Sequence, residues 1–125
     1  MSEFEIFRIH HLMVSDGRLE AFFTINTNAV IFTEHFPDFP IVPGACIVGF
    51  VFECIDKMDK PMRGLFSLQR VAFLEPITPG LALHLVIDKK IGSGGGSEVG
   101  RYNFKICQAA VDFCRGAISL GVDSQ

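Results

Sequence analysis

Three prolines at regular spacing most strongly constrain how this chain folds. Pro37, Pro40 and Pro43 occupy every third position between His35 and Gly44. Proline fixes its own φ and drives the preceding residue toward extended geometry, so this segment is predicted to form a stiff, non-helical arm. Pro43 suits the first position of a helix, where its missing N–H costs nothing. A helix is therefore predicted from Pro43 to about Asp59, ended by Lys60-Pro61.

The predicted helix is apolar on one broad face, as a buried helix is. Its opposite side carries small residues first and carboxylates later. Gly49 costs up to ~1 kcal/mol relative to alanine in a helix interior, so its surroundings should favour a small residue. The apolar face consists of Ile47, Phe50, Val51, Cys54, Ile55 and Met58, and the other side carries Ala45, Cys46, Gly49, Glu53 and Asp56.

The rest of the chain is typical of antiparallel strands. Strands are predicted over residues 3–14, 18–26, 65–74, 81–91, 101–110 and 111–121. The glycine-serine stretch 92–100 is predicted to be a hairpin connection, because no Lys-Ser/Thr pair follows it. These elements indicate an α+β domain spanning residues 1–125, with an antiparallel sheet wrapped around one long central helix. One such unit leaves apolar faces uncovered, so a homodimer is expected.

Composition excludes several classes of function. The net charge is −3 and no basic stripe is present, which argues against nucleic-acid binding. The longest apolar run, 45–52, is far shorter than the ~20 residues of a membrane span, and no secretory leader is visible, so a cytoplasmic protein is expected. The four cysteines and four histidines lack metal-ligand spacing, so reduced thiols and no metal or other cofactor are predicted.

Two motifs resemble a known family. His35-Phe36-Pro37-x-x-Pro40-x-x-Pro43-Gly44, followed by a buried helix, is similar to the hotdog-fold 3-hydroxyacyl-[acyl-carrier-protein] dehydratases of fatty-acid synthesis. The segment 71–80, which ends in Pro76-Ile77-Thr78-Pro79-Gly80, resembles the family's later strand and turn. The resemblance covers most of the chain. It implies a hotdog dimer with two composite sites that act on acyl thioesters carried by acyl carrier protein or CoA.

The resemblance also implies roles for individual residues. His35 falls on the catalytic histidine, which takes a proton from C2 of the acyl thioester. Gly44 falls on the glycine whose backbone N–H binds the thioester carbonyl, as suits a helix N-terminus. The family's helix carboxylate falls on Gly49, which is a departure. The residues expected to line the substrate site are Phe36, Pro43, Ala45, Cys46 and Gly49, although close helix packing explains the small ones equally well.

The missing carboxylate leaves alternatives open. Glu53 lies one helical turn after Gly49 on the same face, so it is the candidate acid, reaching the substrate directly or through water. Otherwise Glu53 is a buried or interface carboxylate paired with a residue such as Arg70. The leading hypothesis is a dehydratase. The alternatives are a hotdog thioesterase and a non-catalytic subunit that binds acyl thioesters.

Overall fold

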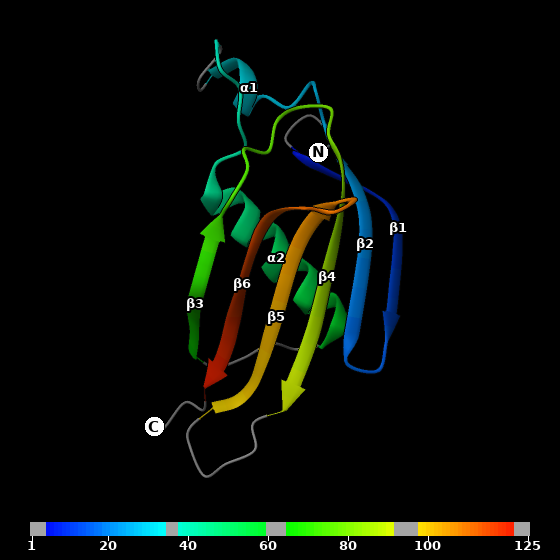
Figure 1. Cartoon of the computed structure of the whole chain (residues 1–125), viewed down its shortest axis with the longest axis vertical. Coiled ribbons are helices and arrows are strands. Elements are labelled where there is room, and N and C mark those ends of the chain that lie inside the picture. The colour runs from blue at the N-terminus through cyan, green and yellow to red at the C-terminus, as the bar shows by residue number, and fades with distance from the viewer. Residues whose placement is uncertain (1–4, 35–37, 60–64, 92–97, 122–125) are drawn as a thin grey trace.

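The computed structural model describes residues 5–34, 38–59, 65–91 and 98–121 (Figure 1). They form the strands β1 (Phe7–Ser15), β2 (Arg18–Ile25), β3 (Leu65–Phe73), β4 (Ala82–Ile91), β5 (Glu98–Gln108) and β6 (Val111–Gly121). The helices are α1 (Ile31–Glu34) and α2 (Gly44–Met58). In this described part of the chain, no helix has the length and apolar character of a bilayer-spanning segment.

All six strands join one antiparallel sheet in the order β1-β2-β4-β5-β6-β3. The strands β1 and β3 therefore form its two edges. Figure 1 shows α2 running obliquely across one face of this sheet, with its N-terminus near β3 and its C-terminus toward β2 and β1. The predicted hotdog architecture, a sheet wrapped around one long helix, is confirmed.

Alternating side chains explain which face of the sheet holds the helix. Residues two apart in a strand point to the same side, and one such set in each central strand is apolar and buried. The buried face of α2 packs against these sets, and each of its large side chains contributes roughly 1.5–3 kcal/mol through burial. The buried sets are Leu19, Ala21, Phe23 and Ile25 in β2, Leu83, Leu85 and Ile87 in β4, Tyr102, Phe104 and Ile106 in β5, and Ile47, Phe50, Val51, Cys54 and Ile55 in α2.

Several strands begin or end up to four residues from the predicted bounds, and the structure also differs at α1 and at the start of α2. The short helix α1 lies within a stretch that showed no helical pattern. Pro43 is the residue before α2 rather than its first residue, with φ −61° and ψ 145°. β5 begins at Glu98, inside the predicted glycine connection, because Gly100 still pairs with Ile91 of β4.

The C-terminus of α2 is tied to the sheet through Asp59. The Tyr102 hydroxyl donates a hydrogen bond of 2.6 Å to Asp59 Oδ2, and Lys89 Nζ lies 3.0 Å from the same oxygen. The Tyr102 hydrogen bond, helped by Lys89, lowers the pKa of Asp59. Burial, together with Asp59, raises the pKa of Tyr102 above its usual value. The carboxyl group therefore stabilises the folded state more when it is ionised than when it is protonated.

Replacing Tyr102 with phenylalanine tests this tie. Because the Asp59 side chain is 38% exposed, solvent weakens the interaction, and we expect a loss of about 0.5–1 kcal/mol in unfolding free energy at pH 7. The depressed pKa stabilises the fold above the ordinary carboxyl value of about 3.9, and this contribution disappears as pH falls through the folded value. Urea unfolding at pH 7 and pH 3 measures both effects. Asp59→Asn is the control, and an equal pH dependence in wild type and Tyr102→Phe would contradict the assignment.

Candidate active site

The N-terminus of α2 presents free backbone amides. The amides of Cys46 and Ile47 both donate to the Pro43 carbonyl, at 3.0 and 3.2 Å. No side chain caps this end, and no described residue accepts a hydrogen bond from the amides of Gly44 or Ala45. Free N–H groups at the positive end of a helix dipole attract an anion or a polarised carbonyl oxygen.

The arm before α2 is held in place by the turn between β3 and β4. The Val42 amide donates a 2.8 Å hydrogen bond to the Ile77 carbonyl, and both side chains are buried. Ile77 belongs to the Pro76–Gly80 motif, so the two sequence motifs meet in space. The Gly80 amide in turn donates to the Ile25 carbonyl at 2.9 Å. The direction in which the chain enters α2 is therefore fixed by the second motif.

An apolar pocket opens beside the free amides. This N-terminal pocket has a volume of about 490 Å³, and its walls come from the first turns of α2 and from β3. The aromatic ring of Phe73 lies against Gly44, so that a Cβ added to Gly44 would be 2.8 Å from the nearest ring carbon. The lining residues are Gly44, Ala45, Val48, Leu68, Val71 and Phe73.

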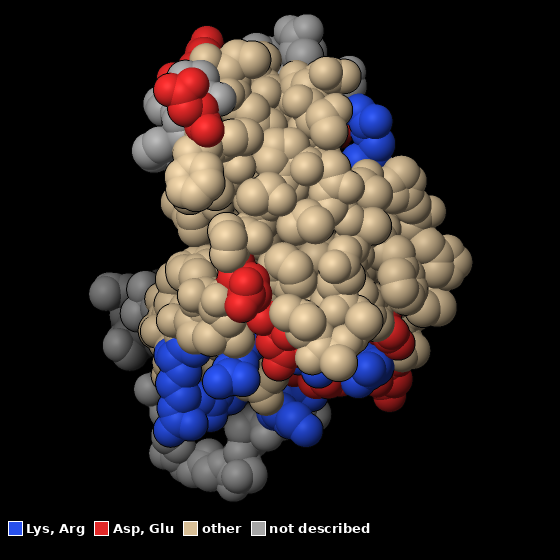
Figure 2. Space-filling view, turned by 45° about the horizontal axis from the view of Figure 1, so that its top comes forward, with Lys and Arg blue, Asp and Glu red and all other residues tan. Residues whose placement is uncertain are grey.

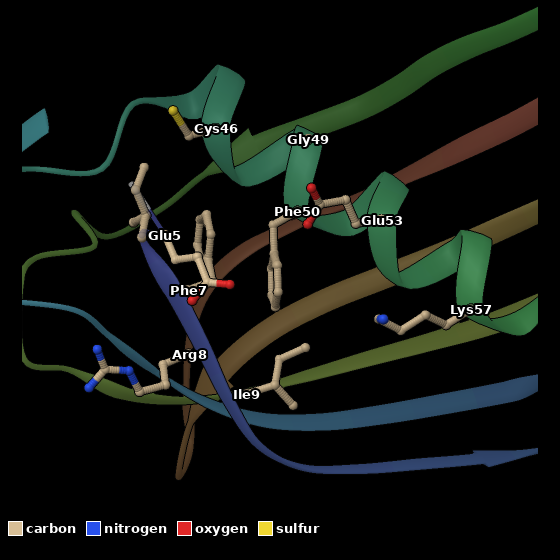
Figure 3. Close-up of a pocket in the computed structure, with 10 residues that line it drawn as sticks. Glu5, Phe7, Arg8, Ile9, Cys46, Gly49, Phe50, Glu53 and Lys57 are labelled. Carbon is tan, nitrogen blue, oxygen red and sulfur yellow. The ribbon is translucent and has the colours of Figure 1, made fainter. Parts of the chain in front are cut away.

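A second and larger hollow runs between β1 and the side of α2. This helix groove measures about 640 Å³ and is lined by residues 5–9 together with Cys46, Gly49, Phe50, Glu53 and Lys57 (Figure 3). The rings of Phe7 and Phe50 stack at 4.3 Å between β1 and α2. A Cβ added to Gly49 would meet no atom within 4 Å. The glycine is thus not required by local packing, and it leaves the groove open at this turn of the helix.

Glu53 lies on the wall of the helix groove and is exposed. Figure 3 shows its carboxylate directed back along α2 toward Gly49, as expected for a helical side chain. No residue in the described ranges forms an ion pair with it. Arg70 lines a different depression, together with Arg101. Within one chain, the interpretation of Glu53 as a buried partner of Arg70 is therefore wrong.

The end of the molecule that carries the N-terminus of α2 is mostly uncharged. Figure 2 turns the upper end of Figure 1 toward the viewer and shows a broad uncharged surface there, while most Lys and Arg side chains gather at the lower end. Such a surface suits an apolar substrate better than a polyanion.

Comparison with known families identifies the chain. The family model described as ApeI-like, the ApeI dehydratase family, matches residues 11–117. The chain belongs to the ApeI-like dehydratase family.

A curated dehydratase is similar in sequence to part of this chain. Over 82 residues the chain is 32% identical to the 3-hydroxyacyl-[acyl-carrier-protein] dehydratase FabZ of Wolbachia sp. subsp. Brugia malayi (strain TRS), covering 58% of this chain and 56% of that protein. The chain thus spans little more than half the length of this curated relative.

Solved structures of low sequence identity share the hotdog fold of this ApeI-like chain. The dehydratase heterocomplex ApeI:P from Xenorhabdus doucetiae superimposes with a TM-score of 0.70 at 20% identity, covering 90% of this chain and 96% of that one. The fluoroacetyl-CoA-specific thioesterase FlK gives a TM-score of 0.57 at 14% identity, covering 87% and 93%.

The structure separates the residues that the resemblance to the 3-hydroxyacyl-[acyl-carrier-protein] dehydratases groups together. His35 and Phe36 lie outside the described residues. Gly44 and Ala45 line the N-terminal pocket, whereas Cys46, Gly49 and Glu53 line the helix groove on the other side of α2. Pro43 lines neither hollow and instead supplies the carbonyl that starts the helix. The small residues therefore do not form one continuous stripe.

Sequence reasoning missed the aromatic residues around both hollows of this ApeI-like chain. Phe73 belongs to the second motif but was not assigned a role, although it covers Gly44. Phe7 and Phe50 were assigned only to a strand and to the apolar face of the helix, yet their stacked rings line the groove. The period-two pattern of β1 places Phe7 toward α2 and was the available signal.

The cysteines divide into two buried and two partly exposed residues. Cys54 and Cys114 are buried, as expected of core thiols, whereas Cys46 and Cys107 are partly exposed. Burial raises the pKa of Cys54 to about 12 and that of Cys114 to about 11, so neither is a thiolate near neutral pH. The described ranges contain no group of three or more His, Cys, Asp or Glu side chains that could hold a metal ion.

Proposed function

We propose that this ApeI-like protein dehydrates 3-hydroxyacyl thioesters to 2-enoyl thioesters and water. The Gly44 and Ala45 amides, which donate to no acceptor among the described residues and lie beside an apolar pocket, carry the proposal. They match the need of the reaction, because negative charge builds on the thioester oxygen when the C2 proton leaves. Preorganised donors at such an oxygen contribute several kcal/mol to catalysis.

The proposed reaction has two proton transfers. The Gly44 N–H binds the thioester carbonyl while His35 takes the proton from C2. The electron pair of the C2–H bond then forms the C2–C3 double bond as the C3–O bond breaks. The departing hydroxyl takes up a proton and leaves as water, so a general acid is required at this end of the substrate.

Glu53 is the proposed acid. It is exposed in the helix groove, it has no ion-pair partner among the described residues, and Gly49 removes the side chain that would stand in its path. An exposed carboxylic acid of this kind protonates a leaving hydroxyl either directly or through one water molecule. Phe36, Cys46 and Gly49 are proposed to contact the substrate between His35 and Glu53.

The site is proposed to be shared between two subunits of a homodimer. The resemblance to 3-hydroxyacyl-[acyl-carrier-protein] dehydratases implies that the histidine and the helix carboxylate come from different protomers. The edge strand β3 supports a dimer, because it exposes large apolar side chains along an unpaired edge, as an interface does. Those side chains include Phe66 at 37%, Leu68 at 50% and Phe73 at 51% relative exposure.

The function is tested with two substrates and two readouts. The protein is incubated with a 3-hydroxyacyl thioester and with a saturated acyl thioester, each on CoA and on a carrier protein, while enoyl product and free thiol are measured separately. We expect enoyl product from the hydroxyacyl substrate without thiol release, from a protein that sediments as a dimer. Thiol release from the saturated substrate would instead identify a thioesterase. Saturable binding without turnover would identify a non-catalytic subunit.

A further inference from the structure

We propose that Phe73 is a positioning residue for the Gly44 amide. Its ring displaces water beside that N–H, so that the thioester carbonyl is held against the amide. The inference rests on the proposed function and adds a residue from β3 to the site at the start of α2. Its starting observation is the contact of the Phe73 ring with Gly44.

The ring contact explains why residue 44 is glycine. A Cβ on Gly44 would lie 2.8, 3.0 and 3.4 Å from three carbons of the Phe73 ring. Gly44 is not among the positive-φ glycines, which are Gly17 and Gly80. A left-handed backbone is therefore not the reason for glycine at this position. The Phe73 ring occupies the space that any larger side chain would need.

The backbone around Phe73 is firmly held, which fixes the point from which the ring extends toward Gly44. Phe73 is the last residue of β3 and pairs with Cys114 of β6. The amides of the next two residues, Leu74 and Glu75, both donate to the Phe113 carbonyl, at 2.8 and 3.3 Å. The ring is nevertheless 51% exposed. One part of it covers Gly44, and the remainder forms a wall of the N-terminal pocket.

An apolar wall next to a hydrogen-bond donor changes the strength of that donor. Water competes for an exposed N–H, whereas a ring that displaces water lowers the local dielectric and strengthens the bond to the developing oxyanion. The effect grows with the charge on the oxygen, so it acts mainly in the transition state. Loss of the ring should therefore lower kcat more than it raises KM.

Substitutions of Phe73 test the inference. Loss of a whole oxyanion donor costs about 10²–10³-fold in kcat, so weakening one by removing its apolar wall should cost about tenfold. We expect Phe73→Ala to lower kcat about tenfold with little change in KM, and Phe73→Tyr, which keeps the ring, to retain most of the wild-type rate. The infrared carbonyl stretch of a bound saturated acyl thioester should shift back toward its value in water in Phe73→Ala.

Phe22→Ala is the matched control. Phe22 is a partly exposed phenylalanine on β2, away from both hollows, and its ring stacks on His84 at 4.2 Å. We expect this variant to leave the carbonyl stretch and kcat unchanged. An unshifted stretch in Phe73→Ala, or equal losses in both variants, would overturn the inference. Because the stretch is measured without turnover, it still tests the role of Phe73 if the wild-type protein does not dehydrate its substrate.

The steric premise has its own test. Gly44→Ala alone should lower the free energy of unfolding, because the new methyl group collides with the Phe73 ring. The same change in a Phe73→Ala background should be tolerated, since the ring is absent. Equal destabilisation in both backgrounds, measured by urea unfolding, would show that the ring is not the reason for glycine.

Discussion

Replacing His35 with alanine should lower the rate of enoyl formation by about 10²–10⁴-fold, the usual contribution of general acid–base catalysis. The described histidines, His10, His11 and His84, all lie on strands and line neither hollow. His10 and His84 are engaged with Thr24 at 2.7 Å and Glu20 at 2.9 Å. Initial rates with a saturating 3-hydroxyacyl thioester measure the loss.

His10→Ala is the control for His35→Ala, because it removes an exposed imidazole from the sheet without touching either hollow. We expect its rate to equal that of wild type. Full activity of His35→Ala would remove the histidine from the mechanism.

Moving the carboxylate from position 53 to position 49, one helical turn earlier, should preserve catalysis. Glu53→Gln keeps the shape of the side chain but removes its acidic proton, and we expect a loss of about 10²-fold. Gly49→Glu in the same background should recover most of the rate. A Cβ at position 49 meets no atom within 4 Å, and position 49 lines the same groove as Glu53. Single-turnover rates of enoyl formation measure both steps.

The control for the restored carboxylate is Gly49→Gln with Glu53→Gln, which fills the same space without an acid. It should remain as slow as Glu53→Gln alone. Wild-type activity of Glu53→Gln would show that Glu53 is not the acid. If Glu53→Gln is slow and Gly49→Glu gives no recovery, the acid must act from a place that position 49 cannot reach.

Much of the fold was predictable because its periodicities are strong. The apolar stripe of α2 and the alternation in β2, β4 and β5 each specify one buried face, and only a sheet curved around a helix buries all of them together. The short helix α1 was missed because its Ile31–Glu34 span is shorter than the repeat that reveals a helix. A single domain over residues 1–125 and a cytoplasmic location stay predictions.

The candidate site was only partly predictable, because its parts are brought together by contacts between distant segments. The motif at Gly44 indicated free amides, and no residue in the described part of the chain accepts from the Gly44 or Ala45 N–H. The ring of Phe73 reaches Gly44 only because β3 ends beside the start of α2. The division of Ala45 and Cys46 between two hollows depends on where β1 and β3 lie relative to α2, which helical spacing alone does not reveal.

The two attachments of α2 have a consequence for access to the helix groove. At its start, the helix follows an arm bonded through Val42 to Ile77, and at its end Asp59 is bonded to Tyr102. One wall of the groove is thus anchored at both ends. The opposite wall is β1, an edge strand with a single neighbour, whose pairing with β2 shifts between Ile9 and His11. Under the proposed function, widening of the groove for a bulky acyl group is therefore expected at β1 rather than at the helix.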